Sequence, residues 1–244
     1  FLLKKVSRRT GFYIALTTAM ITMGYLLFGA IKGKSFFQVK EISIESKDIP
    51  KTFDGYRIIQ LSDIHIGSWG EDTRAMQKAV KLILEQNPDL IVFTGDLVNN
   101  LASELDPFIP VFSQLKAKDG VYSVLGNHDY STYIRWDTPE EQAQELVRLK
   151  EKQAQMGWQL LNNRHVKLHR GNDSIALIGV ENSGSHPFPD HAQLDEAMAG
   201  TEGMFQILLS HDPSHWRREV LPKTDIHLML SGHTHAMQTK IFGF

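Results

Sequence analysis

Residues 89–96 have the sequence DLIVFTGD, a short apolar run followed at once by Gly95-Asp96. The run has the length and the β-branched content of a β-strand. Residues 72–86 and 139–156 have the apolar spacing of helices. Strands that alternate with helices predict an α/β domain in which helices cover the faces of the sheet. Five further runs are strand-like, at 57–62 (RIIQLS), 121–125 (VYSVL), 175–180 (IALIGV), 205–210 (FQILLS) and 226–231 (IHLMLS).

Polar side chains follow five of these predicted strands directly. Taken singly, each cluster is weak evidence, because Asp-x-His is usually an exposed loop and Gly-Asp is commonly a turn. Taken together they indicate a site, since the carboxyl ends of strands are where sites assemble in open α/β sheets. The clusters are 63–65 (DIH), 95–96 (GD), 126–129 (GNHD), 211–212 (HD) and 232–235 (GHTH).

The order D-x-H, GD, GNHD, H and GHTH resembles the signature of the calcineurin-like metallophosphoesterase superfamily. The resemblance implies a four-layer α/β/β/α sandwich and two divalent metal ions bridged by the carboxylate of Asp96. It implies that His128 is the general acid that protonates the leaving group. The remaining ligands would be Asp63, His65 and His235 for one ion, and Asn127, His211 and His233 for the other.

The chemistry of this ligand set limits the metals. The chain has no cysteine, so any ion is held by nitrogen and oxygen atoms, which suits Mn, Fe or Zn. A carboxylate can bridge two such ions, and the ions can lower the pKa of a water and draw charge from a phosphoryl group. The six other histidines are interpreted as structural: His165, His169, His186, His191, His215 and His227.

Two departures from the pattern modify the expectation. Protein Ser/Thr phosphatases of this superfamily have GDxxDRG, whereas this chain has Asn99 in place of the second Asp. This argues against a protein phosphatase and against a His–Asp pair at His128. The chain also stops at Phe244, nine residues after the last motif, so we expect the 55–244 domain to lack a C-terminal edge of its second sheet.

Residues 12–31 contain 20 residues without a charge, which matches the hydrocarbon core of a bilayer. They predict a single transmembrane helix, with a signal peptide and a buried core helix as the alternatives. Residues 1–11 would be its basic flank, and 32–54 a tether with a possible first strand at 37–44. Because the chain begins with Phe1, further upstream spans stay an open alternative.

The charges are unevenly distributed. The first 40 residues contain seven of the 26 Lys and Arg and none of the 28 Asp and Glu, so the remainder has a net charge of −9. This excess of acid disfavours a nucleic-acid-binding face. Four basic residues precede the apolar run and two follow it, which places the domain outside the cytoplasm by the positive-inside rule.

The anchor and the sequence LSDIH at 61–65 are similar to membrane-associated bacterial phosphoesterases that hydrolyse lipid-linked sugar nucleotides, notably UDP-2,3-diacylglucosamine. The prediction is therefore an enzyme of a bacterial cell membrane that hydrolyses phosphodiester or pyrophosphate bonds. The resemblance implies lipid A biosynthesis as a candidate pathway. Two alternatives stay open: an inactive metal-binding membrane scaffold, and a broad phosphodiesterase with soluble substrates. The sequence indicates no oligomeric state.

Overall fold

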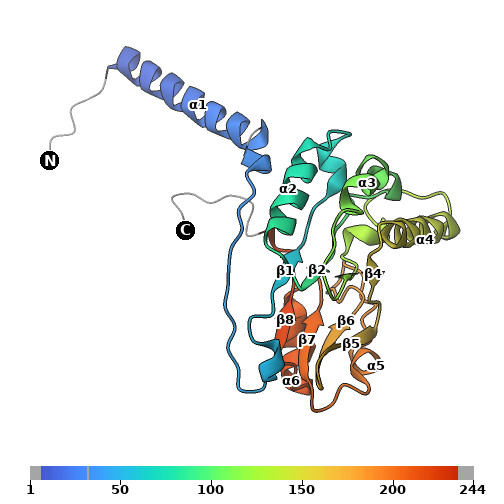
Figure 1. Cartoon of the computed structure of the whole chain (residues 1–244). Helices are drawn as coiled ribbons and strands as arrows, with labels where there is room; N and C mark the ends of the chain where they lie inside the picture. The colour runs from blue at the N-terminus through green and yellow to red at the C-terminus, as the bar shows by residue number, and fades with distance from the viewer. Residues whose placement is uncertain (1–6, 32, 236–244) are drawn as a thin grey trace. The chain divides into compact units, whose positions relative to one another are not determined.

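The computed structural model describes residues 7–31 and 33–235 (Figure 1). The chain divides into two compact units, Phe1–Ile42 and Ser43–Phe244. Lys4 and Lys5 of the predicted basic flank lie outside the described residues, as does the C-terminal end at 236–244. The expectation that the chain lacks an edge of its second sheet stays a prediction. The two units are described separately below.

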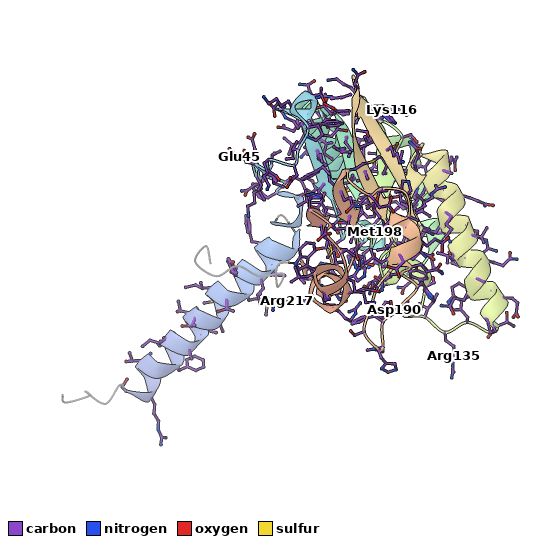
Figure 2. All side chains as sticks on the ribbon, turned by 90° about the horizontal axis from the view of Figure 1, so that it is seen from below. Glu45, Lys116, Arg135, Asp190, Met198 and Arg217 are labelled. Atoms are coloured by element: carbon purple, nitrogen blue, oxygen red, sulfur yellow. The ribbon has the colours of Figure 1, made fainter. Side chains whose placement is uncertain are left out.

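The first unit consists mainly of helix α1 (Arg8–Ile31), followed by a short 3-10 helix (Gly33–Ser35). Within the described part of the chain, Arg8–Gly29 is the one helix whose length and apolar composition allow it to cross a membrane. Large apolar side chains are exposed along it, as Figure 2 also shows. The predicted helix is confirmed, and its insertion into a membrane stays a prediction.

The residues that connect the units contain no strand. Residues 36–46 have no regular secondary structure, so the possible first strand at 37–44 is wrong. Val39, Ile42 and Ile44 are apolar enough for a strand, but their side chains are exposed. A strand needs a neighbour to accept and donate its main-chain hydrogen bonds, and no described strand pairs with these residues.

The second unit contains two four-stranded sheets. In the first sheet all strands are parallel, in the order β1 (Ile58–Leu61), β2 (Leu90–Phe93), β3 (Val121–Ser123) and β4 (Gln159–Leu160). The second sheet has the order β5 (Arg164–Arg170), β6 (Asp173–Gly179), β7 (Phe205–Leu209) and β8 (Leu228–Leu230). In this sheet β5 pairs with β6 in antiparallel orientation, and the other pairs are parallel. The five strands that precede the predicted site residues, β1, β2, β3, β7 and β8, therefore all have parallel neighbours.

The helices lie on the outer faces of the two sheets (Figure 1). The first sheet is covered by α2 (Arg74–Glu85), α3 (Ile109–Phe112) and α4 (Pro139–Gln155). The second is covered by α5 (Leu194–Met198), a π-helical turn (Trp216–Val220) and α6 (Leu221–Lys223). Short 3-10 helices are Lys51–Phe53, Ile66–Trp69, Ala102–Phe108 and His128–Tyr130. The predicted α/β/β/α order of layers is confirmed.

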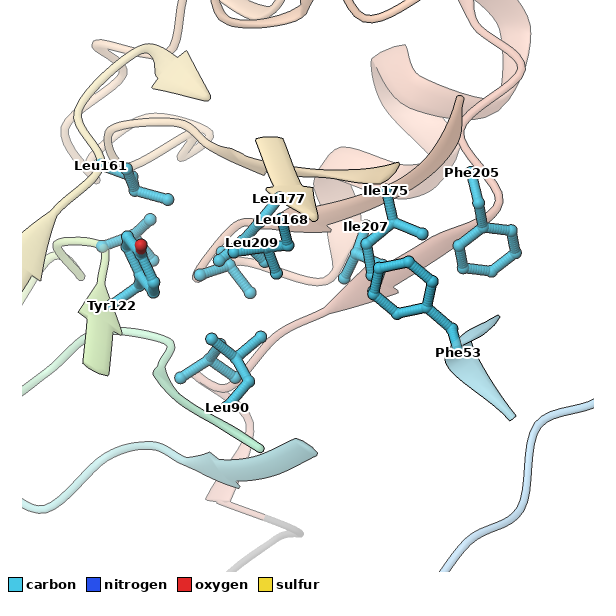
Figure 3. Close-up of a cluster of buried hydrophobic side chains, with 12 residues drawn as sticks. Phe53, Leu90, Tyr122, Leu161, Leu168, Ile175, Leu177, Phe205, Ile207 and Leu209 are labelled. Carbon is cyan, nitrogen blue, oxygen red and sulfur yellow. The ribbon is translucent and has the colours of Figure 1, made fainter. Parts of the chain in front are cut away.

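The main core lies between the two sheets (Figure 3). Strand β6 shows how one strand serves two cores, because alternate side chains point to opposite faces. Ile175 and Leu177 belong to the core between the sheets, whereas Ala176 and Ile178 pack beneath α5. The sandwich therefore holds the strand ends, and the loops that follow them, at fixed positions.

Leu177 offers a test of this core. Its side chain is fully buried, so Leu177→Ala is expected to lower the free energy of unfolding by about 2–5 kcal/mol through lost burial and a residual cavity. The measurement is denaturant unfolding of the full chain in detergent with chelator present. Leu221→Ala removes the same atoms from a side chain that is 60% exposed and is the control. Equal effects of the two substitutions would contradict the assignment of the core.

Candidate metal centre

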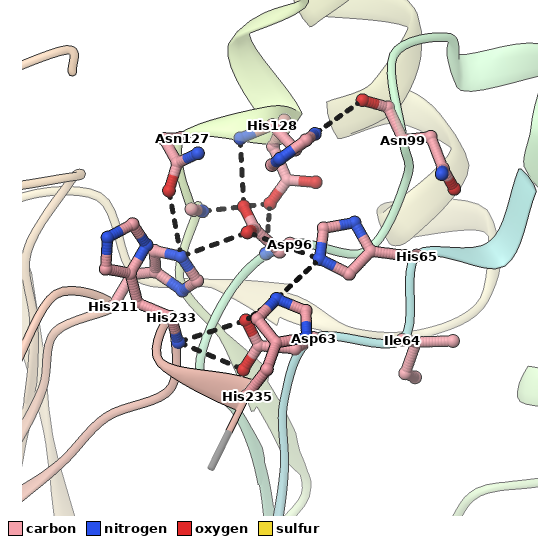
Figure 4. Close-up of polar contacts among 12 residues, drawn as sticks. Asp63, Ile64, His65, Asp96, Asn99, Asn127, His128, His211, His233 and His235 are labelled. Carbon is pink, nitrogen blue, oxygen red and sulfur yellow. Dashed lines mark hydrogen bonds and ion pairs between the residues drawn. The ribbon is translucent and has the colours of Figure 1, made fainter. Parts of the chain in front are cut away.

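The loops that follow five strands bring the predicted ligands together (Figure 4). Four potential ligand atoms lie within 4.8 Å of one another, one each from Asp63, His65, Asp96 and His235. Atoms of Asp96, His211 and His233 form a second such group. Asp96 belongs to both groups, which is the arrangement that a bridging carboxylate requires.

The main chain at these ligands is strained. A positive φ at a residue other than glycine costs of order 1–3 kcal/mol and persists where the surrounding structure enforces it. Such strain clusters at functional sites, which supports a functional reading of these loops. The strained ligands are Asp63 (φ 52°), His65 (φ 44°), Asp96 (φ 60°), His233 (φ 70°) and His235 (φ 49°).

Glycines next to the ligands allow the loops to approach one another closely. Gly95 has φ +100°, and a Cβ there would lie 2.6 Å from the main-chain nitrogen of Gly126. A Cβ on Gly126 would in turn overlap the carboxylate of Asp96. The loops after β2 and β3 therefore touch main chain to main chain, and this contact places Asp96 beside Asn127.

Three hydrogen-bond acceptors converge around His211. Its Nδ1–H donates to the carbonyl of Thr94 at 2.8 Å, which leaves the lone pair on Nε2. That Nε2 lies 3.2 Å from Asp96 Oδ2 and 3.1 Å from Asn127 Oδ1. Burial by itself lowers the pKa of His211, but the hydrogen bond and charge of Asp96 raise it to about 9.

The other group has the same character. His65 Nε2 and His235 Nε2 lie 3.2 Å apart. His65 Nε2 is 3.5 Å from Asp96 Oδ2, and His235 Nε2 is 3.4 Å from Asp63 Oδ1. Burial lowers the pKa of His65, and the neighbouring His128 and His235 lower it further against the charge of Asp96. A neutral imidazole is the form that binds metals. The oxygen and nitrogen donors of both groups thus fit divalent cations.

Two further contacts complete the ligand loops. The main-chain N–H of His233 donates to both carboxylate oxygens of Asp63, at 3.0 and 3.1 Å. The ring of His233 lies 5.1 Å from that of His211, edge to face. The last loop is thereby bound to the first, and all seven predicted ligands lie in one cluster.

His128 lies beside this cluster and has two hydrogen bonds. Its main-chain N–H donates to Asp96 Oδ1 at 2.9 Å, and its ring Nδ1–H donates to the main-chain carbonyl of Asn99 at 2.8 Å. The ring lies 4.6 Å from that of His65, edge to face. Asn99 therefore orients His128 through its main chain, whereas the aspartate of the protein phosphatases would use its side chain.

Asp129 has a role that the sequence did not reveal. Its buried carboxylate accepts four main-chain N–H groups, from Gly126 (2.9 Å), Asp96 (3.0 Å), Leu97 (2.9 Å) and Val98 (3.3 Å). Burial, and next the charge of Asp96, raise the pKa of Asp129 to about 7 against these hydrogen bonds. Asp129 joins the loops after β2 and β3, and its only sequence signal is its place in the GNHD motif.

Among the histidines interpreted as structural, His165, His215 and His227 have side-chain hydrogen-bond partners away from the cluster. His165 Nδ1–H donates to the carbonyl of Ala197, and His227 Nδ1 accepts from the N–H of Gln206. His215 is buried and lies within hydrogen-bond distance of Ser210 and Glu219. These partners stabilise the second sheet and its helices.

Known proteins are similar to this chain in sequence. "Transmembrane protein with metallophosphoesterase domain" of Danio rerio is 32% identical over 227 residues, which cover 90% of this chain and 49% of that protein. An uncharacterised metallophosphoesterase of Bacillus subtilis is 29% identical over 260 residues, covering 98% of this chain and 80% of that protein. This chain spans about half the length of the two vertebrate relatives that it matches, at 49% and 51%.

Among solved structures, NAD nucleotidase of Haemophilus influenzae has a TM-score of 0.48 and 19% sequence identity, covering 73% of this chain and 38% of that one. The relatives come from vertebrates and from bacteria, so the bacterial membrane stays a prediction. A model of the calcineurin-like phosphoesterase family matches residues 56–237, which include every predicted ligand and most of the second unit. The chain belongs to the calcineurin-like phosphoesterase family.

Proposed function

We propose that the chain is a membrane-anchored phosphoesterase that uses two divalent metal ions to hydrolyse phosphodiester or pyrophosphate bonds. The observation that carries the proposal is the sharing of Asp96 between two groups of ligand atoms. Two-metal hydrolases need a ligand of this kind because it spans ions about 3.5–4 Å apart. Membership of the family supports the class of reaction.

Each residue of the cluster has a role in this proposal. Asp63, His65 and His235 hold one ion, Asn127, His211 and His233 hold the other, and Asp96 bridges them. When bound, the two ions supply a nucleophile by lowering the pKa of a water and stabilise charge on the phosphoryl oxygens. Mn, Fe and Zn fit the nitrogen and oxygen donors, and availability decides among them.

His128 gives the leaving group its proton. Its Nδ1–H is engaged by the carbonyl of Asn99, so the proton to be transferred is at Nε2. Histidine is the side chain that most often transfers protons in enzymes, so this residue type is suited to the step. A pure scaffold needs no proton donor, so the presence of His128 beside the ligands favours an enzyme over an inactive metal-binding protein.

The apolar helix α1 favours a substrate that resides in the membrane. About twenty residues of tether, at ~3.3 Å each, confine the domain to within about 70 Å of the bilayer. Confinement raises the effective concentration of substrates in the same membrane. We therefore propose a lipid-linked phosphoester or pyrophosphate, with UDP-2,3-diacylglucosamine as the example favoured by resemblance. The charge bias around α1 favours a domain outside the cytoplasm. That placement conflicts with UDP-2,3-diacylglucosamine as substrate, because this nucleotide lipid is made on the cytoplasmic side, so the two are alternatives.

Asp96→Ala tests the shared ligand. The substitution is expected to weaken both metal sites, so that the protein retains fewer than the two equivalents expected for the unsubstituted chain. The measurement is elemental analysis after metal loading and removal of free ions. Asp225→Ala, at an exposed carboxylate, is the control. Two equivalents in the Asp96 variant would contradict the bridging role.

His128→Ala tests the proton donor. Turnover is expected to fall by roughly 10²–10⁴-fold, the usual contribution of general acid catalysis. Metal content stays intact because the main-chain N–H that bonds Asp96 is retained. The loss is expected to shrink for esters with acidic leaving groups such as nitrophenolate. His169→Ala, on the exposed face of β5, is the control. An equal loss for good and poor leaving groups would assign His128 a binding role instead.

Substrate class is tested by comparing a lipid-linked sugar nucleotide in mixed micelles with soluble phosphodiesters at equal concentration. The full chain in the same detergent is expected to hydrolyse the lipid-linked compound faster, because α1 places enzyme and substrate in one phase. The measured quantity is the initial rate of product release. Faster hydrolysis of the soluble diesters would favour a broad phosphodiesterase, the alternative reading.

A further inference from the structure

Tyr133 contacts two residues of the candidate site in different ways. Its hydroxyl accepts a hydrogen bond from Asn127 Nδ2 at 2.7 Å. Its ring stacks on that of His128, with 4.3 Å between ring centroids and 24° between the planes. The side chain is 48% exposed, so burial in the core does not account for its position. Neither the sequence motifs nor the proposed mechanism uses this residue.

The hydroxyl determines how the amide of Asn127 lies. A metal ion binds the amide oxygen, and the nitrogen is a donor that cannot bind it. Asn127 Oδ1 faces His211 Nε2 and Nδ2 faces Tyr133. The phenol oxygen accepts from Nδ2, so Oδ1 points toward the other predicted metal ligands.

The ring determines how the imidazole of His128 lies. The Nδ1–H bond to the carbonyl of Asn99 fixes one atom of the imidazole but leaves the ring free to swing about it. The ring is nearly perpendicular to that of His65, and one of its faces stacks on Tyr133. Stacking on the phenol therefore limits this swing.

The loop between the 3-10 helix His128–Tyr130 and α4 is anchored well enough to present Tyr133. Ser131 has a positive φ of 58°, and its hydroxyl donates to the carbonyl of Asn100. Trp136 Nε1–H donates to the carbonyl of Ser131 at 2.8 Å. Gln142, on α4, donates to the carbonyl of Tyr130 at 2.9 Å. The chain on both sides of Tyr133 is thus bound to its surroundings.

We propose that Tyr133 is a positioning residue that directs the oxygen of Asn127 toward a metal ion and holds the ring of His128 for proton transfer. The second role rests on the proposed function, whereas the first requires only that the site binds metal. Phe188 provides a contrast, because its ring also contacts a predicted metal ligand, lying edge to face with His233 at 5.1 Å. Phe188 has no hydroxyl group and so cannot orient that side chain by a hydrogen bond.

Two substitutions separate the roles. Tyr133→Phe removes the hydroxyl and keeps the stacked ring, whereas Tyr133→Leu removes both. Arg135→Ala changes an exposed side chain of the same loop and is the matched control (Figure 2). All variants are prepared as the full chain in detergent. Equal denaturation midpoints of the metal-free proteins serve to exclude a general loss of stability.

The first readout is a titration of metal-free protein with Co²⁺, in which the absorbance of the bound ion is measured at each addition. Tyr133→Phe is expected to weaken one of the two equivalents by roughly 10–100-fold, the usual effect of removing a partner that orients a ligand. The other equivalent is expected to bind as in the unsubstituted chain. Unchanged binding of both equivalents would overturn the role of the hydroxyl, whether or not the protein hydrolyses any ester.

The second readout is turnover at saturating metal with esters of differing leaving groups. Tyr133→Phe is expected to regain near-normal turnover, because its ring still holds His128. Tyr133→Leu is expected to remain at least about tenfold slower on poor leaving groups, a part of the 10²–10⁴-fold effect of a general acid, and near normal on nitrophenyl esters. Equal loss on all esters, or the same losses in Arg135→Ala, would overturn the role of the ring.

A failure of the proposed function has a different signature. If the unsubstituted chain binds two metal ions and hydrolyses no phosphoester, the second readout overturns both the reaction and the ring's role in it. The Co²⁺ titration still decides the role of the hydroxyl. The two failures are therefore distinguishable within one set of variants.

Discussion

The carboxylate of Asp96 is buried, with 1% of the residue exposed, yet it is surrounded by groups that compete to accept protons or bind cations. A buried charge is tolerated only when it is paired and hydrogen-bonded. Oδ1 accepts the N–H of His128, and Oδ2 lies near the imidazoles of His65 and His211. Burial opposes ionisation, but the hydrogen bond and charge of His211 lower the pKa of Asp96. These surroundings make Asp96 a candidate ligand for cations, as its place in both groups of ligand atoms also indicates.

The rest of the domain can be understood as support for that carboxylate. Two sheets packed over a common core fix the five strand ends, and glycines at 95 and 126 let the following loops meet without a side chain between them. The side-chain carboxylate of Asp129 then joins the two loops by accepting hydrogen bonds from their main-chain N–H groups. Because these bonds do not depend on neighbouring side chains, the loops can keep their shape while residues around the site vary.

Much of the fold and of the ligand set could be predicted because both depend on local patterns. The runs at 57–62 and 89–94 became β1 and β2, and 72–86 and 139–156 became α2 and α4, each within a few residues. Strand β5 was missed because its sequence, RHVKLHR, has only two apolar residues and lies at the edge of its sheet. The short helices were missed because each has too few turns to show a periodicity. The strand proposed at 37–44 was wrong because apolar content alone does not supply a pairing partner.

The candidate site shows the same division. Its ligands follow strands and could be found by motif, and the structure brings all seven together, while their role as ligands stays a proposal. Asp129 and Tyr133 could not be assigned, because their roles consist of contacts with main chain and side chains of other loops. The sequence argued against a His–Asp pair at His128, but it could not identify the main-chain carbonyl of Asn99 as the partner, because no pattern of side chains reveals a main-chain contact.

The left-handed conformations of five ligand residues have a consequence for how the protein can change. At each of these positions glycine would adopt the same conformation with less strain, so Asp63→Gly or His235→Gly would relieve strain while deleting a ligand. Variants selected only for resistance to heat would therefore drift toward loss of the site, as happens where activity needs a strained arrangement. The side chains at these five positions therefore cost stability in this chain, and a role in binding metal would account for that cost.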